Sequence, residues 1–107
     1  MRLSIVVVLL AVVAVAAAQS ERDRSAGQAV FDHWCAPCHA PGPGHPGTQA
    51  LEVLYGGAKP AALEERNDLL PEITRAFVRT GVSVMPPFRK TEITDDELDA
   101  LARYLAP

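Results

Sequence analysis

Residues 35–39 read Cys35-Ala36-Pro37-Cys38-His39, and this stretch gives the strongest indication of the fold. C-x-x-C-H is the attachment signature of c-type haem. Two thiols separated by two residues match the spacing of the two porphyrin vinyl groups, and the adjacent His39 is placed to bind the iron. The chain has only two cysteines, so no other thiol competes with Cys35 and Cys38. The motif predicts one covalently attached haem c per chain.

The N-terminus has the pattern of an export signal. Arg2 gives a short positive region, and residues 3–18 are almost continuously apolar and end in three alanines. Small residues there are typical of a signal-peptidase site, and we expect cleavage after Ala18 and a periplasmic protein. An uncleaved membrane anchor is the alternative, although a spanning helix normally needs about 20 apolar residues.

This interpretation divides the chain into three parts. Residues 1–18 are expected to be the signal peptide, residues 19–25 a polar and mobile segment, and residues 26–107 a single domain. Removing residues 1–18 takes away only Arg2, so the formal net charge changes from −3 to −4. An acidic protein is a poor partner for nucleic acid, and no contact with a membrane is expected beyond the signal peptide.

The domain is expected to be all-α, with three to five short helices around the haem. Residues 26–34 have helical periodicity and would deliver the motif at their C-terminal end. Residues 71–80 form a second predicted helix, which begins at Pro71 and ends at Gly81, a plausible left-handed cap. Ile73, Phe77 and Ala76 are predicted to be its inward face.

A third helix is predicted near the C-terminus. Residues 94–97 read Thr-Asp-Asp-Glu, a capping box, and apolar residues follow at helical spacing through Leu105. Between the helices, residues 40–47 contain three prolines and three glycines, which predicts a stiff loop. Residues 48–58 favour a helical turn that ends at Gly56 and Gly57.

A haem iron that only passes electrons needs a second axial ligand. After cleavage the chain contains one methionine, Met85, which lies in a proline-rich segment 46 residues after His39. A thioether is a soft ligand, and His/Met ligation raises the reduction potential of a haem. A core-filling role for Met85 is the alternative. We favour His39 and Met85 as the two metal ligands.

Other residues are candidates for supporting roles. His33 and His45 are expected to face solvent rather than to bind iron. The second nitrogen of the His39 ring needs an orienting acceptor. We predict the carbonyl of Pro46, with that of Pro41 as the second choice. Four residues are candidate donors to a haem propionate, and nothing in the sequence chooses among them: Trp34, Arg66, Arg75 and Arg79.

With these features the chain resembles the class I c-type cytochromes. The resemblance covers CAPCH, the downstream Met85-Pro86 and a final helix that ends in Leu101-x-x-Tyr104-Leu105. In that family the first and last helices cross closely through a glycine, a leucine and aromatic residues. Gly27 and Phe31, with Leu101 and Tyr104, match these positions.

A narrower resemblance concerns residues 70–81 and 84–88. They look like the small cytochrome subunits of flavocytochromes of the p-cresol methylhydroxylase and eugenol hydroxylase type. This resemblance implies a flavoprotein dehydrogenase or hydroxylase as electron donor, and an electron carrier that passes electrons to the respiratory chain or another carrier rather than an enzyme.

Three alternative functions are open at this point. A haem enzyme or gas sensor would need an open iron position, which Met85 argues against. A thiol–disulfide oxidoreductase would use Cys35 and Cys38 but normally has a strand-rich scaffold. A zinc site would need more ligands than His33, His39 and His45 supply at suitable spacing.

Overall fold

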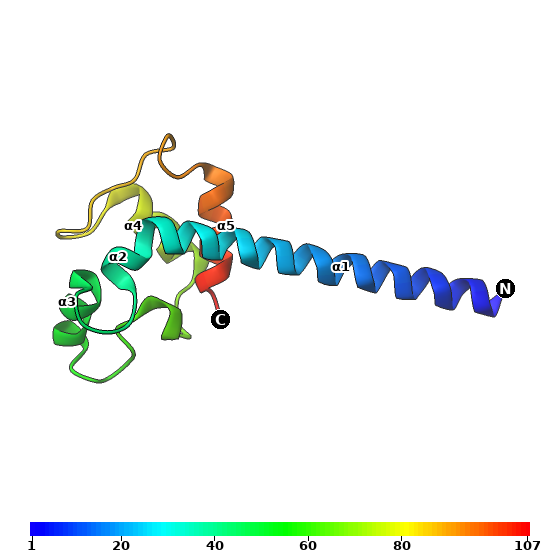
Figure 1. Ribbon diagram of the computed structural model, residues 1–107, viewed down its shortest axis with the longest axis horizontal. Helices are drawn as coiled ribbons and strands as arrows, with labels where there is room; N and C mark the ends of the chain where they lie inside the picture. The colour runs from blue at the N-terminus through cyan, green and yellow to red at the C-terminus, as the bar shows by residue number, and fades with distance from the viewer.

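The computed structural model describes residues 1–107 and is built from helices (Figure 1). These are α1 (Arg2–Val30), α2 (Ala36–His39), α3 (Pro46–Tyr55), α4 (Pro71–Thr80) and α5 (Asp95–Leu105), with a π-helical turn η1 (Phe31–Cys35) and a 3₁₀ turn η2 (Leu63–Glu65). The only β pairing is an isolated bridge between Val82 and Met85. The predicted small all-α fold is confirmed.

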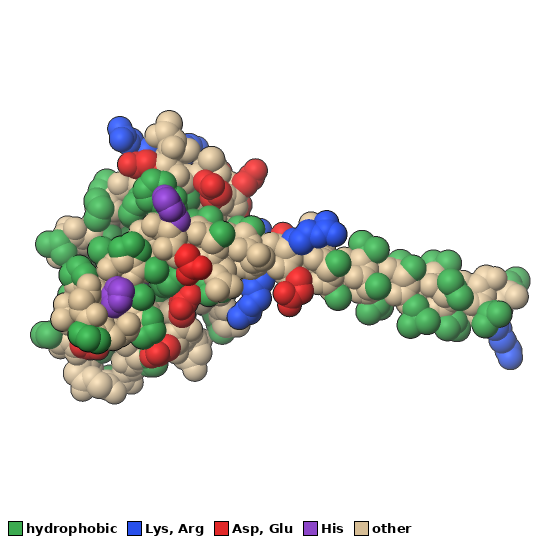
Figure 2. All heavy atoms as spheres, in the orientation of Figure 1, with side chains coloured by type: hydrophobic (Ala, Val, Ile, Leu, Met, Phe, Trp, Pro, Cys, Tyr) green, Lys and Arg blue, Asp and Glu red, His purple; other side chains and the backbone are tan.

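Helix α1 extends far beyond the domain as an exposed arm (Figures 1 and 2). It contains an 18-residue apolar stretch, none of it buried, that is long enough to cross a membrane; a signal sequence has the same property. Residues 19–25, which we expected to be mobile, are helical here. They contain no proline or glycine, so a helix propagates through them from the alanine-rich residues on one side and the packed residues on the other.

The domain end of α1 crosses α5 at very short range, as the cytochrome resemblance implies. A Cβ atom on Gly27 would lie 2.6 Å from Tyr104 Cβ and would also collide with the Ala100 carbonyl. Phe31 and Leu101 are fully buried beside this crossing, and the Phe31 and Tyr104 rings lie 6.1 Å apart. Glycine therefore sets the distance between the two helices.

Replacing Gly27 with alanine is expected to lower the free energy of unfolding by about 1–3 kcal/mol, because two packed backbones would have to separate. Alanine otherwise favours a helix by about 1 kcal/mol over glycine. A lower free energy of unfolding in the alanine variant would therefore be caused by the close helix crossing. Chemical denaturation measures the effect. Gln28→Ala, at the next and exposed position, is the control. Equal stability of the two variants would contradict the close crossing.

Helix α4 turns a different face inward than the sequence predicted. Thr74 and Val78 are buried, whereas Ile73 and Phe77 remain 43% and 44% exposed. Each exposed residue precedes a buried one, so its side chain lies about 100° around the helix from the packed face. The inward face is set by contact with α5 and by the core cluster around Val78, Leu98 and Leu101.

The predicted helix ends are largely confirmed. Thr94 and Glu97 form the complete capping box of α5. Helix α3 ends at Gly56 in the left-handed region, and it begins at Pro46, two residues inside the stretch predicted to be loop. Gly81 ends α4 with φ 69° and ψ 171°, so its φ is positive as predicted but its ψ is extended rather than left-handed helical.

Candidate haem-binding site

The CAPCH motif lies where α1 ends and the chain turns into the domain. The π turn η1 ends at Cys35, and the Ala36 N–H donates to the carbonyl of Phe31, five residues back. A π turn adds a residue to a helical turn and is frequent at functional sites. Cys35 is half-buried, Cys38 is exposed, and the two are not joined in a disulfide.

Cys35 does not have the lowered pKa of a redox-active thiol. Burial, and secondarily the Cys38 sulfur, raise the pKa of Cys35 to about 12. Thiol–disulfide oxidoreductases depend on a thiolate with a lowered pKa. The raised pKa of Cys35 therefore disfavours the thiol–disulfide interpretation.

The ring of His39 packs against the first turn of α3. A Cβ atom on Gly47 would lie 2.9 Å from His39 Nδ1 and 2.7 Å from the Cys38 carbonyl oxygen, so only glycine fits beside the ring. Burial lowers the pKa of His39, which favours the neutral imidazole that binds metals.

The predicted hydrogen bond from His39 to Pro46 is not present. His39 Nδ1 is buried and has no hydrogen-bond partner, so Pro41 does not supply one either. Pro46 is the first residue of α3, and a carbonyl there points along the helix axis toward later N–H groups. The proline is close in sequence, but helix formation directs its carbonyl away from the ring.

Two side-chain hydrogen bonds, which the sequence did not indicate, fold the loop after the motif. His45 Nδ1 donates to the carbonyl of Pro37 over 3.0 Å, and buried Thr48 donates to the carbonyl of Ala40 over 2.8 Å. Together they tie the start of α3 to the motif. This brings Gly47 against His39, and it gives the half-buried His45 a structural hydrogen bond at the protein surface.

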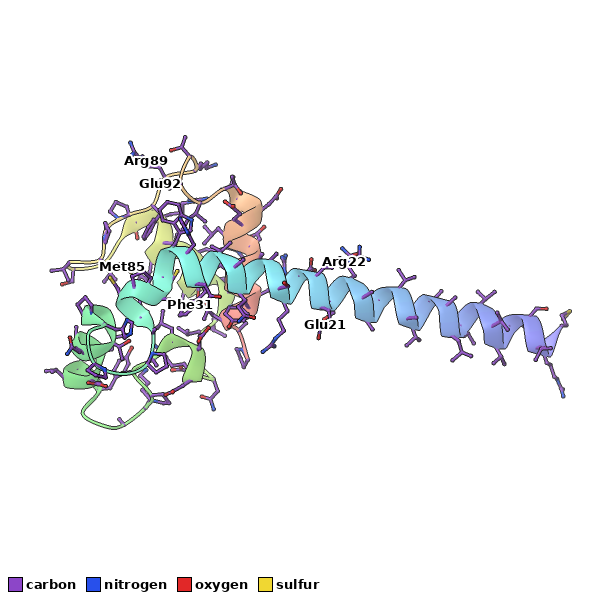
Figure 3. All side chains as sticks on the ribbon, viewed as in Figure 1. Glu21, Arg22, Phe31, Met85, Arg89 and Glu92 are labelled. Atoms are coloured by element: carbon purple, nitrogen blue, oxygen red, sulfur yellow. The ribbon has the colours of Figure 1, made fainter.

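Met85 is half-buried against the core cluster and lies toward the end of the molecule that holds α2 (Figures 1 and 3). Its backbone pairs with Val82 in a tight turn, through N–H···O distances of 2.9 and 3.1 Å. A Cβ atom on Gly81 would lie 2.6 Å from the Met85 carbonyl oxygen. The turn, and with it the thioether, is therefore held close to the end of α4.

The four propionate candidates all make contacts within the protein. Arg66 donates to Asp68 and to the hydroxyl of Tyr55. Arg75 pairs with Asp99, and Arg79 donates to the segment between α4 and α5. Trp34 packs edge-on against Phe88 and against the exposed His33.

The predicted donor set has the chemistry that haem c requires. A neutral imidazole and a thioether, together with two unpaired thiols spaced for thioether bonds, are the groups that haem c uses. No cluster of three or more His, Cys, Asp or Glu side chains is positioned to hold a metal ion. The unpartnered Nδ1 of His39 is consistent with a ring placed by packing rather than by a protein hydrogen bond.

Residues 22–105 match the family model for cytochrome c oxidase, cbb3-type, subunit III. The chain belongs to this family. No curated protein and no solved structure matches it significantly. The membership confirms the expected c-type cytochrome domain, with haem as the redox group, an electron-carrier role and redox proteins as partners. The match begins at residue 22, shortly after the apolar stretch of α1.

Proposed function

We propose that the cytochrome carries one haem c, covalently bound through Cys35 and Cys38, with His39 and Met85 as axial ligands. The observation that carries this proposal is the neutral His39 ring held by Gly47 beside two unpaired thiols. A haem bound there would supply a single redox-active iron that cycles between its ferric and ferrous states. The chain would supply the ligands and a low-polarity setting.

Apolar side chains next to the proposed site support a large flat cofactor. Ile73, Phe77 and Val82 remain 43–45% exposed. They lie on α4 and at the start of the Met85 turn. A porphyrin between the His39 and Met85 sides would cover such side chains, and this would add apolar burial to a domain of about 90 residues.

The test is an absorption spectrum of the purified protein before and after acid–acetone extraction. Sharp reduced c-type bands that remain with the polypeptide would support covalent attachment. Haem that leaves with the solvent would contradict it. Avid carbon monoxide binding by the native reduced protein would instead favour the second candidate, an enzyme or gas sensor with an open iron.

The arm of α1 is proposed to be a signal peptide that is removed on export to the periplasm. Its exposed apolar stretch makes no contact that the domain needs. We expect the mature protein to begin at Gln19, since Ala16 to Ala18 fit the cleavage pattern. N-terminal sequencing and intact mass of the periplasmic fraction measure this. A membrane-bound protein that retains Met1 would identify the arm as an anchor.

The electron donor is proposed to be a flavoprotein dehydrogenase or hydroxylase. The support is the resemblance of residues 70–81 and 84–88 to flavocytochrome subunits, and these residues make up α4 and the Met85 turn. Co-purification with a flavin-containing protein, followed by stopped-flow reduction of the cytochrome, tests the proposal. Reduction only by a partner without flavin would contradict it.

A further inference from the structure

Met85 lies in residues 81–93, which join α4 to α5 and are called the Met85 segment below. Apart from the Val82–Met85 bridge, no helix or strand pairing stabilises this segment. Pro86 and Pro87 also lack backbone N–H groups that could tie the chain down. The position of the thioether therefore depends on the Val82–Met85 turn and on contacts near the C-terminal end of the segment.

One side chain makes several of those contacts. Arg79, in the last turn of α4, uses Nη1 to donate to the carbonyls of Phe88 (3.2 Å) and Ile93 (2.9 Å). Its Nη2 donates to the Asp95 carboxylate over 2.9 Å. The Arg79 side chain is only 22% exposed, whereas that of Asp95 is 63% exposed. The guanidinium thus joins two points of the segment to α4 from a sheltered position.

Phe88 itself is held by three contacts. Its carbonyl accepts from Arg79, its N–H donates to the Val78 carbonyl over 2.7 Å, and its ring packs against Trp34 with centroids 5.8 Å apart. Trp34 directly precedes Cys35 in the sequence. Phe88 is therefore held between α4 and the part of the chain that carries the attachment motif.

The link from Phe88 to Met85 is short and stiff. Only Pro86 and Pro87 lie between them, and each ring locks its own φ near −65°. The residue before a proline is also restricted to extended conformations. A shift of the Phe88 backbone is therefore expected to move Met85 with it.

We propose that Arg79 is a positioning residue for Met85: by holding Phe88 and Ile93 it determines how readily the thioether leaves its site. The inference rests on the proposed His39/Met85 ligation and deepens it. Replacing Arg79 with neutral glutamine would remove the charged donors from two backbone carbonyls. Hydrogen bonds from charged groups contribute enough stability that the fraction of protein with Met85 detached from the iron should rise about tenfold.

The experiment is a titration of the ferric protein with imidazole, which competes with Met85 for the iron. The thioether-to-iron charge-transfer band reports the bound methionine. Apparent affinity for a competitor scales with the fraction of protein in which Met85 is detached. Arg79→Gln is therefore expected to bind imidazole about tenfold more tightly than the natural protein, with an unchanged far-ultraviolet dichroism spectrum.

Two control variants separate positioning from general ion pairing. Arg75 lies one turn earlier on α4 and pairs with Asp99 over 2.7 Å, without a contact to the Met85 segment. Arg75→Gln should leave imidazole affinity within about twofold. Asp95→Asn removes the exposed carboxylate partner and leaves both carbonyl contacts, so it should also change the affinity by less than about twofold, as exposed ion pairs contribute little.

Equal imidazole affinity in Arg79→Gln and the natural protein would overturn the proposal, and so would an equal increase in Arg75→Gln. If Arg79→Gln does not fold, Arg79→Lys keeps the charge with a single donor group and should give an intermediate affinity; natural affinity in Arg79→Lys would also overturn it. A natural protein that lacks the charge-transfer band would show instead that Met85 ligation, and thus the proposed function, has failed.

Discussion

Cys35→Ala/Cys38→Ala is expected to abolish covalent haem attachment completely. Without the two thiols no thioether bond can form, and any haem held by His39 alone would be exchangeable. After acid–acetone extraction the polypeptide should show no haem absorbance, and its intact mass should equal that of the bare chain. Each single variant should retain one thioether bond and yield less protein with attached haem.

Pro37→Ala is the matched control for the cysteine variants. Pro37 lies between the two thiols, is exposed, and contributes its backbone carbonyl to His45 rather than its ring. Alanine keeps that carbonyl and the spacing of the motif, so attachment should remain nearly complete. Haem that stays bound to the double cysteine variant through extraction would show that the attachment site is elsewhere.

Met85→Ala is expected to lower the reduction potential and to open the iron to external ligands. A thioether favours the ferrous state, and axial ligands set haem potentials over a range of about 0.8 V, so loss of one ligand should be among the largest single effects in this protein. Spectroelectrochemical titration measures the potential, and carbon monoxide binding by the reduced form reports the open position.

Val84→Ala serves as its control, because Val84 is adjacent in the same turn and 94% exposed. It should have the potential and carbon monoxide affinity of the natural protein. An unchanged potential and spectrum in Met85→Ala would show that the methionine is not a ligand, and Met85 would then be a core residue.

Local sequence patterns predicted much of the secondary structure. The helix over Pro71–Thr80 and the capping box at Thr94 were identified correctly, because both depend on residues within one or two turns. Thr74 and Val78, rather than the predicted Ile73 and Phe77, form the face of α4 that packs on the protein core. Apolar character alone does not distinguish a side chain packed on α5 from one on an adjacent face, and both occur on this helix.

In the candidate site too, the sequence predicted what neighbouring residues decide and missed the contacts between residues that are distant in sequence. The motif predicted Cys35, Cys38 and His39 as site residues from their spacing along the chain alone. It did not identify the bond from His45 to Pro37, the packing of Gly47 on the His39 ring, or the contacts of Arg79. Each of these joins groups whose separation depends on how the intervening loop folds.

The sequence by itself determined the all-helical class, the haem motif, the apolar N-terminal stretch and the close crossing expected at Gly27, because these follow from local spacing or from a family pattern. The tertiary structure alone decided which groups surround His39 and what holds the Met85 segment. A hydrogen bond or packing contact forms only when two backbones reach the same place, and that position results from the packing of α1, α4 and α5 together.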